Sequence, residues 1–221
     1  MSALISFSGV TIFQDDRPVV GNLNVQINPG EFVYLLGKTG SGKSSFLRTI
    51  YGDVKLSSGE ARVCGYDLAH LRQRDIPFLR RKLGIVFQDF QLLSDRSVYD
   101  NLQFVMRATG WRDSKKIRVR IDEVLRKVDL AGRENKMPHE LSGGEQQRIS
   151  IARALVNEPE VILADEPTGN LDPESSEEIL KLLKELSGTG RSVLFATHDM
   201  LVYNKFPSRT LLFENGHVQE R

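Results

Sequence analysis

The sequence predicts an α/β fold built on a mainly parallel β-sheet with flanking helices. Its basis is a set of short apolar runs, each followed at once by polar residues. The runs are continuous rather than alternating, as expected for strands covered on both faces, and they span residues 32–36, 84–87, 161–164 and 192–196. Because ligands of open α/β sheets lie beyond the carboxyl ends of the strands, we expect the functional site at that edge.

The N-terminal part of the chain has a different pattern. Leu23, Val25 and Ile27 alternate with polar residues before a turn at residues 28–30. Such alternation is typical of antiparallel strands with one face in water. We therefore expect an antiparallel β portion ahead of the parallel sheet.

After Gln88, the apolar residues recur at the spacing of α-helices. Ser97 fits the N-cap of a helix over residues 98–108. The next helix has one apolar face, formed by Ile117, Ile121, Val124 and Val128. These patterns predict an inserted helical subdomain of about residues 89–157.

The C-terminal part continues with a helix and a hairpin. Asp172 fits an N-cap and Pro173 the first helical position, while Gly188 is expected just past the other end. An apolar run at residues 211–213 is followed by the pair Asn215-Gly216, which predicts a hairpin turn.

Composition limits the class of protein. A chain of 221 residues with 40% hydrophobic residues suits one domain over residues 1–221. Thirty basic against 29 acidic residues leave a net charge of +1, which gives no reason to expect nucleic acid as a direct partner. The lone cysteine, Cys64, excludes an intrachain disulfide and predicts a buried thiol in a reducing compartment. No apolar run approaches the ~18 residues of a spanning helix, so a cytoplasmic chain is expected.

A phosphate-binding motif follows the first apolar run. Residues 37–44 fit the pattern G-x-x-x-x-G-K-[ST] between a strand and a predicted helix at 45–51. Glycines let backbone N–H groups surround phosphate oxygens, and the helix N-terminus adds partial positive charge. A Gly/Ser-rich surface loop is the competing interpretation, which the flanking strand and helix disfavour. The nucleotide-binding residues predicted here are Gly37, Lys38, Thr39, Gly40, Ser41, Gly42, Lys43, Ser44 and Ser45.

Two carboxylates end the third apolar run. Asp165 suits Mg²⁺, directly or through water, and Glu166 is placed to polarise an attacking water. Ser44 is expected to hold the same ion, and Lys43 to bridge the β- and γ-phosphates. An Asp-Glu pair alone often caps a turn, so its meaning depends on the phosphate loop.

Residues 141–148 allow two interpretations that are compatible. Ser142 and Glu145 fit a capping box on the helix that follows. Gly143 and Gly144, however, weaken a helix start while permitting close approach of a ligand to the backbone.

Taken in order, these motifs resemble those of the ATP-binding cassette (ABC) family over essentially the whole chain. The family signature is LSGGQ-like, and here it is Leu141, Ser142, Gly143, Gly144 and Glu145. The resemblance implies a RecA-like P-loop NTPase core that hydrolyses ATP with Mg²⁺. It assigns catalysis to Lys43, Glu166 and His198, the metal to Ser44, Gln88 and Asp165, adenine stacking to Phe13, and the D-loop to Asp172.

The resemblance also implies a homodimer that forms around ATP. Two subunits pair head to tail, so that ATP on one phosphate loop is covered by Ser142, Gly143 and Gly144 of the other. Hydrolysis then removes the bridge and the dimer opens. Because Asp165, Glu166 and His198 are all present, we expect a hydrolysis-competent enzyme.

Residues 88–101 resemble the cell-division branch of the family. That branch implies an integral membrane partner of the FtsX type, a peripheral position on the inner face of the cell membrane, and regulation of cell-wall hydrolysis. The alternative is an ATPase subunit of a lipoprotein-releasing or macrolide/peptide exporter. Whether anything is transported is left open, because the ATP chemistry is common to both.

The same stretch predicts a docking groove for the membrane partner. Its apolar members, at the junction of core and helical subdomain, are Phe90, Leu92, Leu93 and Tyr99. The competing interpretation makes them core of the helical subdomain, because apolar residues at helical spacing are usually buried.

Overall fold

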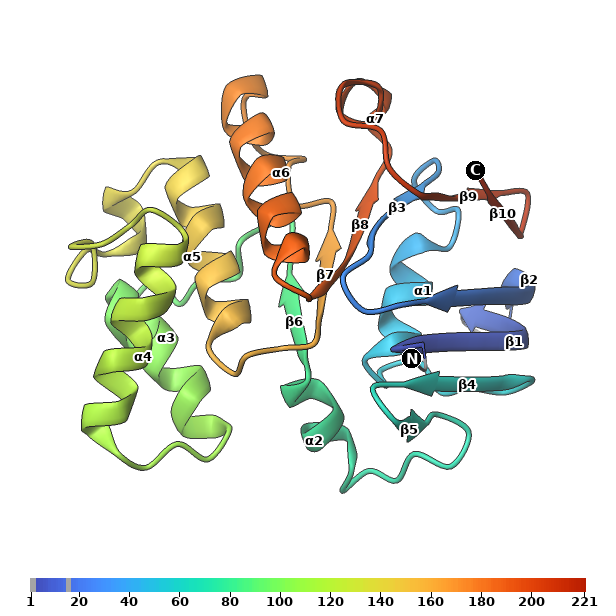
Figure 1. Cartoon of the computed structure of the whole chain (residues 1–221), viewed down its shortest axis with the longest axis horizontal. Helices are drawn as coiled ribbons and strands as arrows, with labels where there is room; N and C mark the ends of the chain where they lie inside the picture. Colours follow the sequence, from blue (N-terminus) through green and yellow to red (C-terminus); the bar gives the residue numbers. More distant parts are fainter. Residues whose placement is uncertain (1–2, 15–16) are drawn as a thin grey trace.

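The computed structural model describes residues 3–14 and 17–221, arranged around two sheets (Figure 1). The larger sheet has the strand order β10-β9-β3-β8-β7-β6, and the smaller one β2-β1-β4-β5. The larger sheet contains β3 (Phe32–Leu36), β6 (Leu83–Val86), β7 (Val161–Asp165), β8 (Ser192–Thr197), β9 (Thr210–Glu214) and β10 (His217–Glu220). The smaller sheet contains β1 (Ile5–Gln14), β2 (Arg17–Ile27), β4 (Glu60–Val63) and β5 (Tyr66–Asp67).

The four predicted parallel strands are confirmed and are neighbours. β3 pairs in parallel with β8, β8 with β7, and β7 with β6. β9 continues the parallel set beside β3, and β10 returns antiparallel through the predicted turn at Asn215 and Gly216, both of which have positive φ. The antiparallel portion is confirmed as well, since β1 pairs antiparallel with β2 and β4. The α/β fold class is therefore as predicted.

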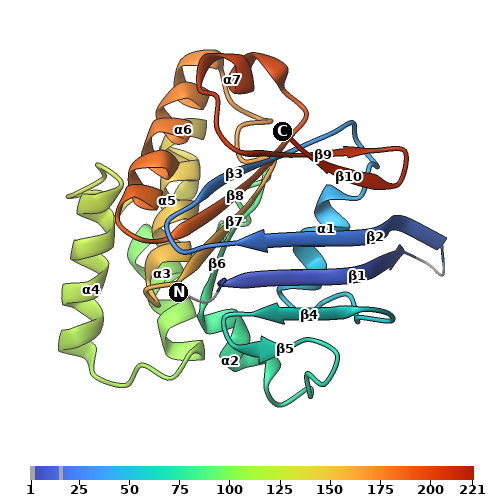
Figure 2. The same cartoon turned by 45° about the vertical axis from the view of Figure 1, so that its right-hand side comes forward.

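The parallel sheet is covered on both faces, which explains its continuous apolar strands. One face, with Val33 and Leu35, packs with α1 (Lys43–Ile50) and the antiparallel sheet. The other face, with Tyr34 and Phe195, packs with α6 (Pro173–Gly188) and the helices of the middle of the chain. In Figure 2, α1 lies between the two sheets, where it contacts both β1 and β7.

The middle of the chain is helical. It contains α3 (Val98–Ala108), α4 (Ser114–Lys127), the short η1 (Pro138–Glu140) and α5 (Gly143–Leu155), after α2 (Ile76–Arg81), which precedes β6. In Figure 1, α3, α4 and α5 lie together on the side away from the antiparallel sheet. The predicted caps are present: Ser97 accepts from the Asp100 amide, and Asp172 from the Ser175 amide. The last helix, α7 (Met200–Lys205), follows β8.

Several boundaries differ from prediction by one or two residues. α1 begins at Lys43 rather than Ser45, because Gly42 takes the left-handed conformation (φ 102°) and starts the helix inside the motif. Gly188 is the last residue of α6, not the residue past its end. β6 ends at Val86, which leaves Phe87 in the loop.

Two further expectations concern Cys64 and membrane spans. Cys64 is buried, and burial raises the pKa of its thiol to about 12, which makes it an inert packing residue as expected. Among the described residues, no helix combines the length and apolarity that crossing a membrane requires.

Asn101 fixes the segment that connects β6 to α3. It is buried, and its amide donates to the carbonyls of Leu93 (3.1 Å), Arg96 (3.1 Å) and Ser97 (3.0 Å). Its Oδ1 accepts from the Leu93 N–H at 2.8 Å. One side chain thus contacts four backbone groups of this segment, and for the Leu93 N–H and the Arg96 carbonyl it is the partner that the segment itself does not supply.

We expect Asn101→Ala to lower the free energy of unfolding by about 2–4 kcal/mol, because the Leu93 N–H and the Arg96 carbonyl lose their hydrogen-bond partner and a buried side chain is truncated. Urea unfolding at pH 7 measures this change. Val119→Ala, at an exposed position of α4, is the control and should change stability by less than about 0.5 kcal/mol. A loss for Asn101→Ala as small as that of the control would contradict the bracing role.

Candidate functional site

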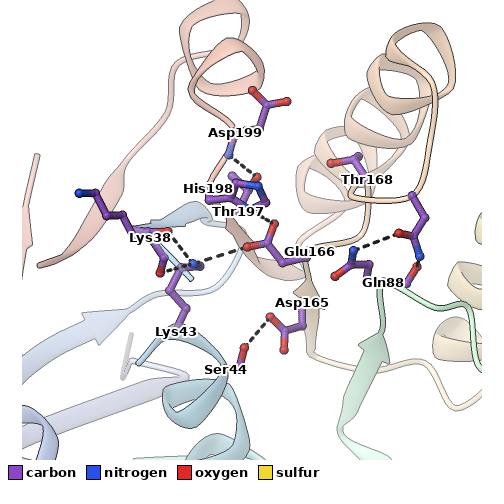
Figure 3. A network of polar contacts seen from close by, with 12 residues as sticks. Lys38, Lys43, Ser44, Gln88, Asp165, Glu166, Thr168, Thr197, His198 and Asp199 are labelled. Carbon is purple, nitrogen blue, oxygen red and sulfur yellow. Dashed lines mark hydrogen bonds and ion pairs between the residues drawn. The ribbon is translucent and has the colours of Figure 1, made fainter. Parts of the chain in front are cut away.

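The predicted site residues meet at one edge of the parallel sheet. The phosphate loop follows β3, Asp165 ends β7, His198 follows β8, and Gln88 follows β6. Since these strands are parallel neighbours, their carboxyl ends share that edge (Figure 3). A cleft of about 450 Å³ opens there, lined by Gln14, Thr39, Gly40, Ser41, Gly42, Lys43, Ser44, Ser45, Phe87, Gln88, Asp89, Asp165, Glu166 and His198.

Lys43 holds the phosphate loop from inside. Its side chain is only 5% exposed, and Nζ donates to the carbonyls of Gly37 (2.6 Å) and Lys38 (3.2 Å). The same nitrogen lies 3.5 Å from Glu166 Oε1. A buried cation at a helix N-terminus, within a curved backbone, is the environment that an anionic phosphate requires.

Ser44 and Asp165 form the predicted metal pair. Ser44 Oγ donates to Asp165 Oδ1 at 3.1 Å, which brings together the first turn of α1 and the end of β7. Burial raises the pKa of the Asp165 carboxyl above its usual range, and the charge of Glu166 adds to the rise. A hydroxyl and a carboxylate are hard oxygen ligands, so the pair fits Mg²⁺ bound together with phosphate oxygens.

Glu166 and His198 are joined by a hydrogen bond. His198 Nδ1 lies 3.0 Å from Glu166 Oε2, so the carboxylate has Lys43 on one oxygen and the imidazole on the other. Glu166 has a φ of +49°, the left-handed region that glycine favours and other residues enter at a cost of about 1–2 kcal/mol. This conformation turns the carboxylate out of β7 and toward the cleft.

Gln88 is held by the segment that precedes α6. Its Nε2 donates to Asn170 Oδ1 at 3.1 Å, and Asn170 Nδ2 donates to the Gln88 carbonyl at 3.1 Å. A Cβ at Gly169 would lie 2.7 Å from Gln88 Nε2, so glycine is needed for this approach. Gln88 thus lines the cleft and is tied to the D-loop segment.

The signature residues begin α5 and do not line this cleft. Ser142 Oγ accepts from the Glu145 amide while Glu145 accepts from the Ser142 amide, so the predicted capping box is present. The two glycines allow close packing against the start of α6: a Cβ on Gly144 would lie 3.0 Å from Ser175 Oγ. Leu141 is buried in the core that α5 shares with the sheet.

Strand β1 contributes one residue to the wall of the cleft. Gln14, not Phe13, is in the cleft wall, and its Oε1 accepts from Ser45 Oγ at 3.1 Å. Neighbouring residues of a strand point to opposite faces, so only one of these two side chains faces the cleft. Adenine stacking by Phe13 therefore stays a prediction.

Sequence reasoning also missed Gln147 and Asn170. Gln147 lies in the stretch 141–148, and Asn170 stands two residues before Asp172 of the D-loop, but each contacts backbone from a distant part of the chain, which the motifs do not reveal. Gln147 is fully buried on α5. The signal in the sequence was a polar residue within a helix whose apolar residues were expected to be buried.

We expect Asp165→Asn to stabilise the nucleotide-free chain by about 0.5–2 kcal/mol at pH 7.5, although it removes a metal ligand. The amide keeps an acceptor for Ser44 and loses the buried charge beside Glu166. A carboxyl with a raised folded-state pKa destabilises the folded chain fully above that pKa, and no longer does so below the unfolded-state pKa, where it is protonated in both states. The gain should therefore shrink on acidification, as the pH falls through the raised pKa of Asp165.

Thermal unfolding at several pH values tests this expectation. Asp95→Asn, at a largely exposed carboxylate, is the matched control and should show no such gain. A gain that grew on acidification would contradict the assigned direction of the pKa shift.

Comparison with known proteins shows the family to which the chain belongs. The ABC transporter family model matches residues 20–169. The chain is 48% identical over 202 residues to the cell division ATP-binding protein FtsE of Mycobacterium tuberculosis, covering 91% of this chain and 87% of the relative. It is 45% identical over 206 residues to FtsE of Streptococcus pneumoniae, covering 93% of this chain and 89% of the relative.

Solved structures share the fold. CbiO1 from Clostridium perfringens, part of the ABC transporter complex cbiONQ, has a TM-score of 0.90 at 31% identity and covers 99% of this chain and 88% of its own. The dimeric bacterial ABC transporter cassette MJ0796 has a TM-score of 0.84 at 35% identity and covers 98% and 97%. A further dimeric structure of MJ0796, bound to ADP and Pi, also has a TM-score of 0.84. The chain belongs to the ABC transporter family of ATP-binding proteins, and within it to the relatives of FtsE.

Proposed function

We propose that the chain is the ATP-hydrolysing subunit of a membrane ABC complex of the FtsEX type, acting in cell division. The observation that carries the proposal is the convergence of Lys43, Asp165, Glu166 and His198 in one cleft, in a chain close to FtsE over nine-tenths of its length. In this role two cassettes close around ATP. The resulting conformational change is transmitted to a membrane partner of the FtsX type, which regulates cell-wall hydrolysis.

The predicted site residues in the cleft have distinct parts in the reaction. The phosphate loop and Lys43 bind the β- and γ-phosphates. Ser44, Asp165 and Gln88 would hold Mg²⁺, which neutralises charge on the phosphate oxygens when bound. Glu166 accepts a hydrogen bond from the attacking water, and His198 fixes the second carboxylate oxygen at 3.0 Å.

Closure requires a second subunit. The signature residues lie outside the cleft of their own chain, at the N-terminus of α5. A helix N-terminus with two glycines offers backbone N–H groups to a phosphate, so Ser142, Gly143 and Gly144 would complete the cleft of a partner copy. The dimeric cassette structures of MJ0796 support this arrangement.

We expect Glu166→Gln to lower kcat by at least about 100-fold and to trap an ATP-bound dimer, because the amide keeps the shape but no longer acts as a base. ATPase assays and light scattering with Mg²⁺ and ATP measure both effects. Glu185→Gln, at an exposed position of α6, is the control: it should hydrolyse ATP at the parental rate, and its dimer should open normally. Hydrolysis by Glu166→Gln at the parental rate would show that Glu166 is not the base.

The membrane partner would dock where the core meets the helical region. The structure shows a groove of about 280 Å³ there, between α2 and β6 on one side and α3 and α5 on the other. None of the four predicted docking residues lines this groove. Leu92 and Tyr99 pack against the core, as the competing interpretation had it, Phe90 is half-buried, and Leu93 is 36% exposed. Ala108 is exposed and lines the groove itself. Docking there would hold the chain at the inner face of the membrane.

We expect Leu93→Glu and Ala108→Glu each to abolish or strongly reduce recruitment to the membrane partner, because a carboxylate in an apolar contact is costly to desolvate. ATP affinity should stay within about twofold of the parent. Co-purification with the partner measures recruitment, and Val119→Glu, at an exposed apolar position of α4, is the control. Parental recruitment of both test variants would overturn the docking proposal.

A further inference from the structure

One buried amide joins the two loops that carry Gln88 and Glu166. The side chain of Gln147, on α5, is fully buried, and its Nε2 donates to the carbonyls of Phe87 (3.1 Å) and Pro167 (2.7 Å). Phe87 immediately precedes Gln88, and Pro167 immediately follows Glu166. Because β6 and β7 are neighbouring parallel strands, their ends lie close enough to share one NH₂ group.

The two bonds need the amide that is present. An uncharged side chain of this length supplies two N–H donors from one atom only if it is glutamine. Gln147 Oε1 is buried and, among the described residues, has no hydrogen-bond partner. Rotating the amide would place that oxygen against two carbonyl oxygens, so the donating orientation holds even with an unpaired acceptor.

A second side chain of α5 anchors the same loop further on. Arg153 donates to the Phe90 carbonyl at 2.9 Å and to the Gln91 carbonyl. Phe90 (φ 58°) and Gln91 (φ 49°) are both in the left-handed region, so this loop keeps a conformation that its own residues disfavour. Helix α5 therefore holds the loop on both sides of Gln88, and through Gln147 it also holds the residue after Glu166.

We propose that Gln147 is a positioning residue of the ATPase reaction. It keeps Gln88 and Glu166 in register with α5, the helix that starts at the signature residues, so that a displacement of this helix moves both groups together. Gln147 contacts neither nucleotide nor water in this role. The inference rests on the proposed ATPase function and extends it to how the two loops are coordinated.

The first test is kinetic, on the full-length chain. Gln147→Met keeps the length and most of the volume of the side chain and removes both donors. We expect kcat to fall at least about tenfold, since small displacements of catalytic groups are costly, while KM for ATP stays within about twofold because the phosphate loop is untouched. Gln147→Asn keeps an uncharged amide and shortens its reach, so it should lower kcat in the same direction, and it decides the question if the Met variant does not fold. A kcat within twofold of the parent, or a raised KM with unchanged kcat, would overturn the proposal.

The second test asks whether Gln147 acts through Gln88. In a double-mutant cycle, the loss caused by Gln147→Met should be clearly smaller in a Gln88→Ala background than in the parent. Losses that multiply independently would contradict action through that loop. Ile121→Ala, in the buried core of α4, is the control for general destabilisation, and its effect should multiply with that of Gln88→Ala.

The third test is independent of catalysis. Hydrogen exchange of the nucleotide-free chain should accelerate in Gln147→Met at both residues 87–91 and residues 166–170, but not in the phosphate loop. Acceleration at one segment only, or an equal pattern in Ile121→Ala, would overturn the shared-anchor role. The proposed ATPase function is tested separately, by ATP hydrolysis of the parent chain. Absence of hydrolysis would overturn that function, whereas an unchanged exchange pattern in Gln147→Met would overturn only the role of Gln147.

Discussion

The parallel pairing of β3, β8, β7 and β6 is the constraint on which the site depends. Parallel strands release their chains at one edge, so four loops far apart in sequence meet there whatever their individual conformations. The phosphate loop, the Asp165-Glu166 pair, His198 and Gln88 all lie at such strand ends. Covering helices and the antiparallel sheet keep the strands buried, which is why the strands are continuously apolar.

Three non-glycine residues in the loops at this edge have a disfavoured backbone conformation. Glu166, Phe90 and Gln91 all have positive φ, and each lies in a loop that leaves a strand of the parallel set. Such conformations persist only where surrounding contacts fix them. Here those contacts come largely from α5, through hydrogen bonds to backbone carbonyls, so the helix that bears the signature also sets the shape of the catalytic loops.

Charge in the cleft is arranged to be neutralised by a ligand. Lys43 is buried against two carbonyls and Glu166, while Asp165 is buried beside Glu166 with a raised pKa. Two adjacent carboxylates attract a metal cation, and the buried lysine attracts a phosphate anion. A metal–phosphate ligand would therefore satisfy both kinds of charge at once. Because the pKa of Asp165 is raised, its ionised form disfavours the nucleotide-free folded state.

The sequence by itself determined the elements and their chemistry. Strand burial, the caps at Ser97 and Asp172, the hairpin at Asn215 and the phosphate motif depend on short-range patterns, and all of these were predictable. Tertiary structure alone decided which side chains reach the cleft and which brace it: Gln14 rather than Phe13 lines it, and Gln147 bridges two loops. The physical reason is that such contacts join residues 20 to 60 positions apart, whose approach is fixed by strand order and helix packing rather than by neighbours in the chain.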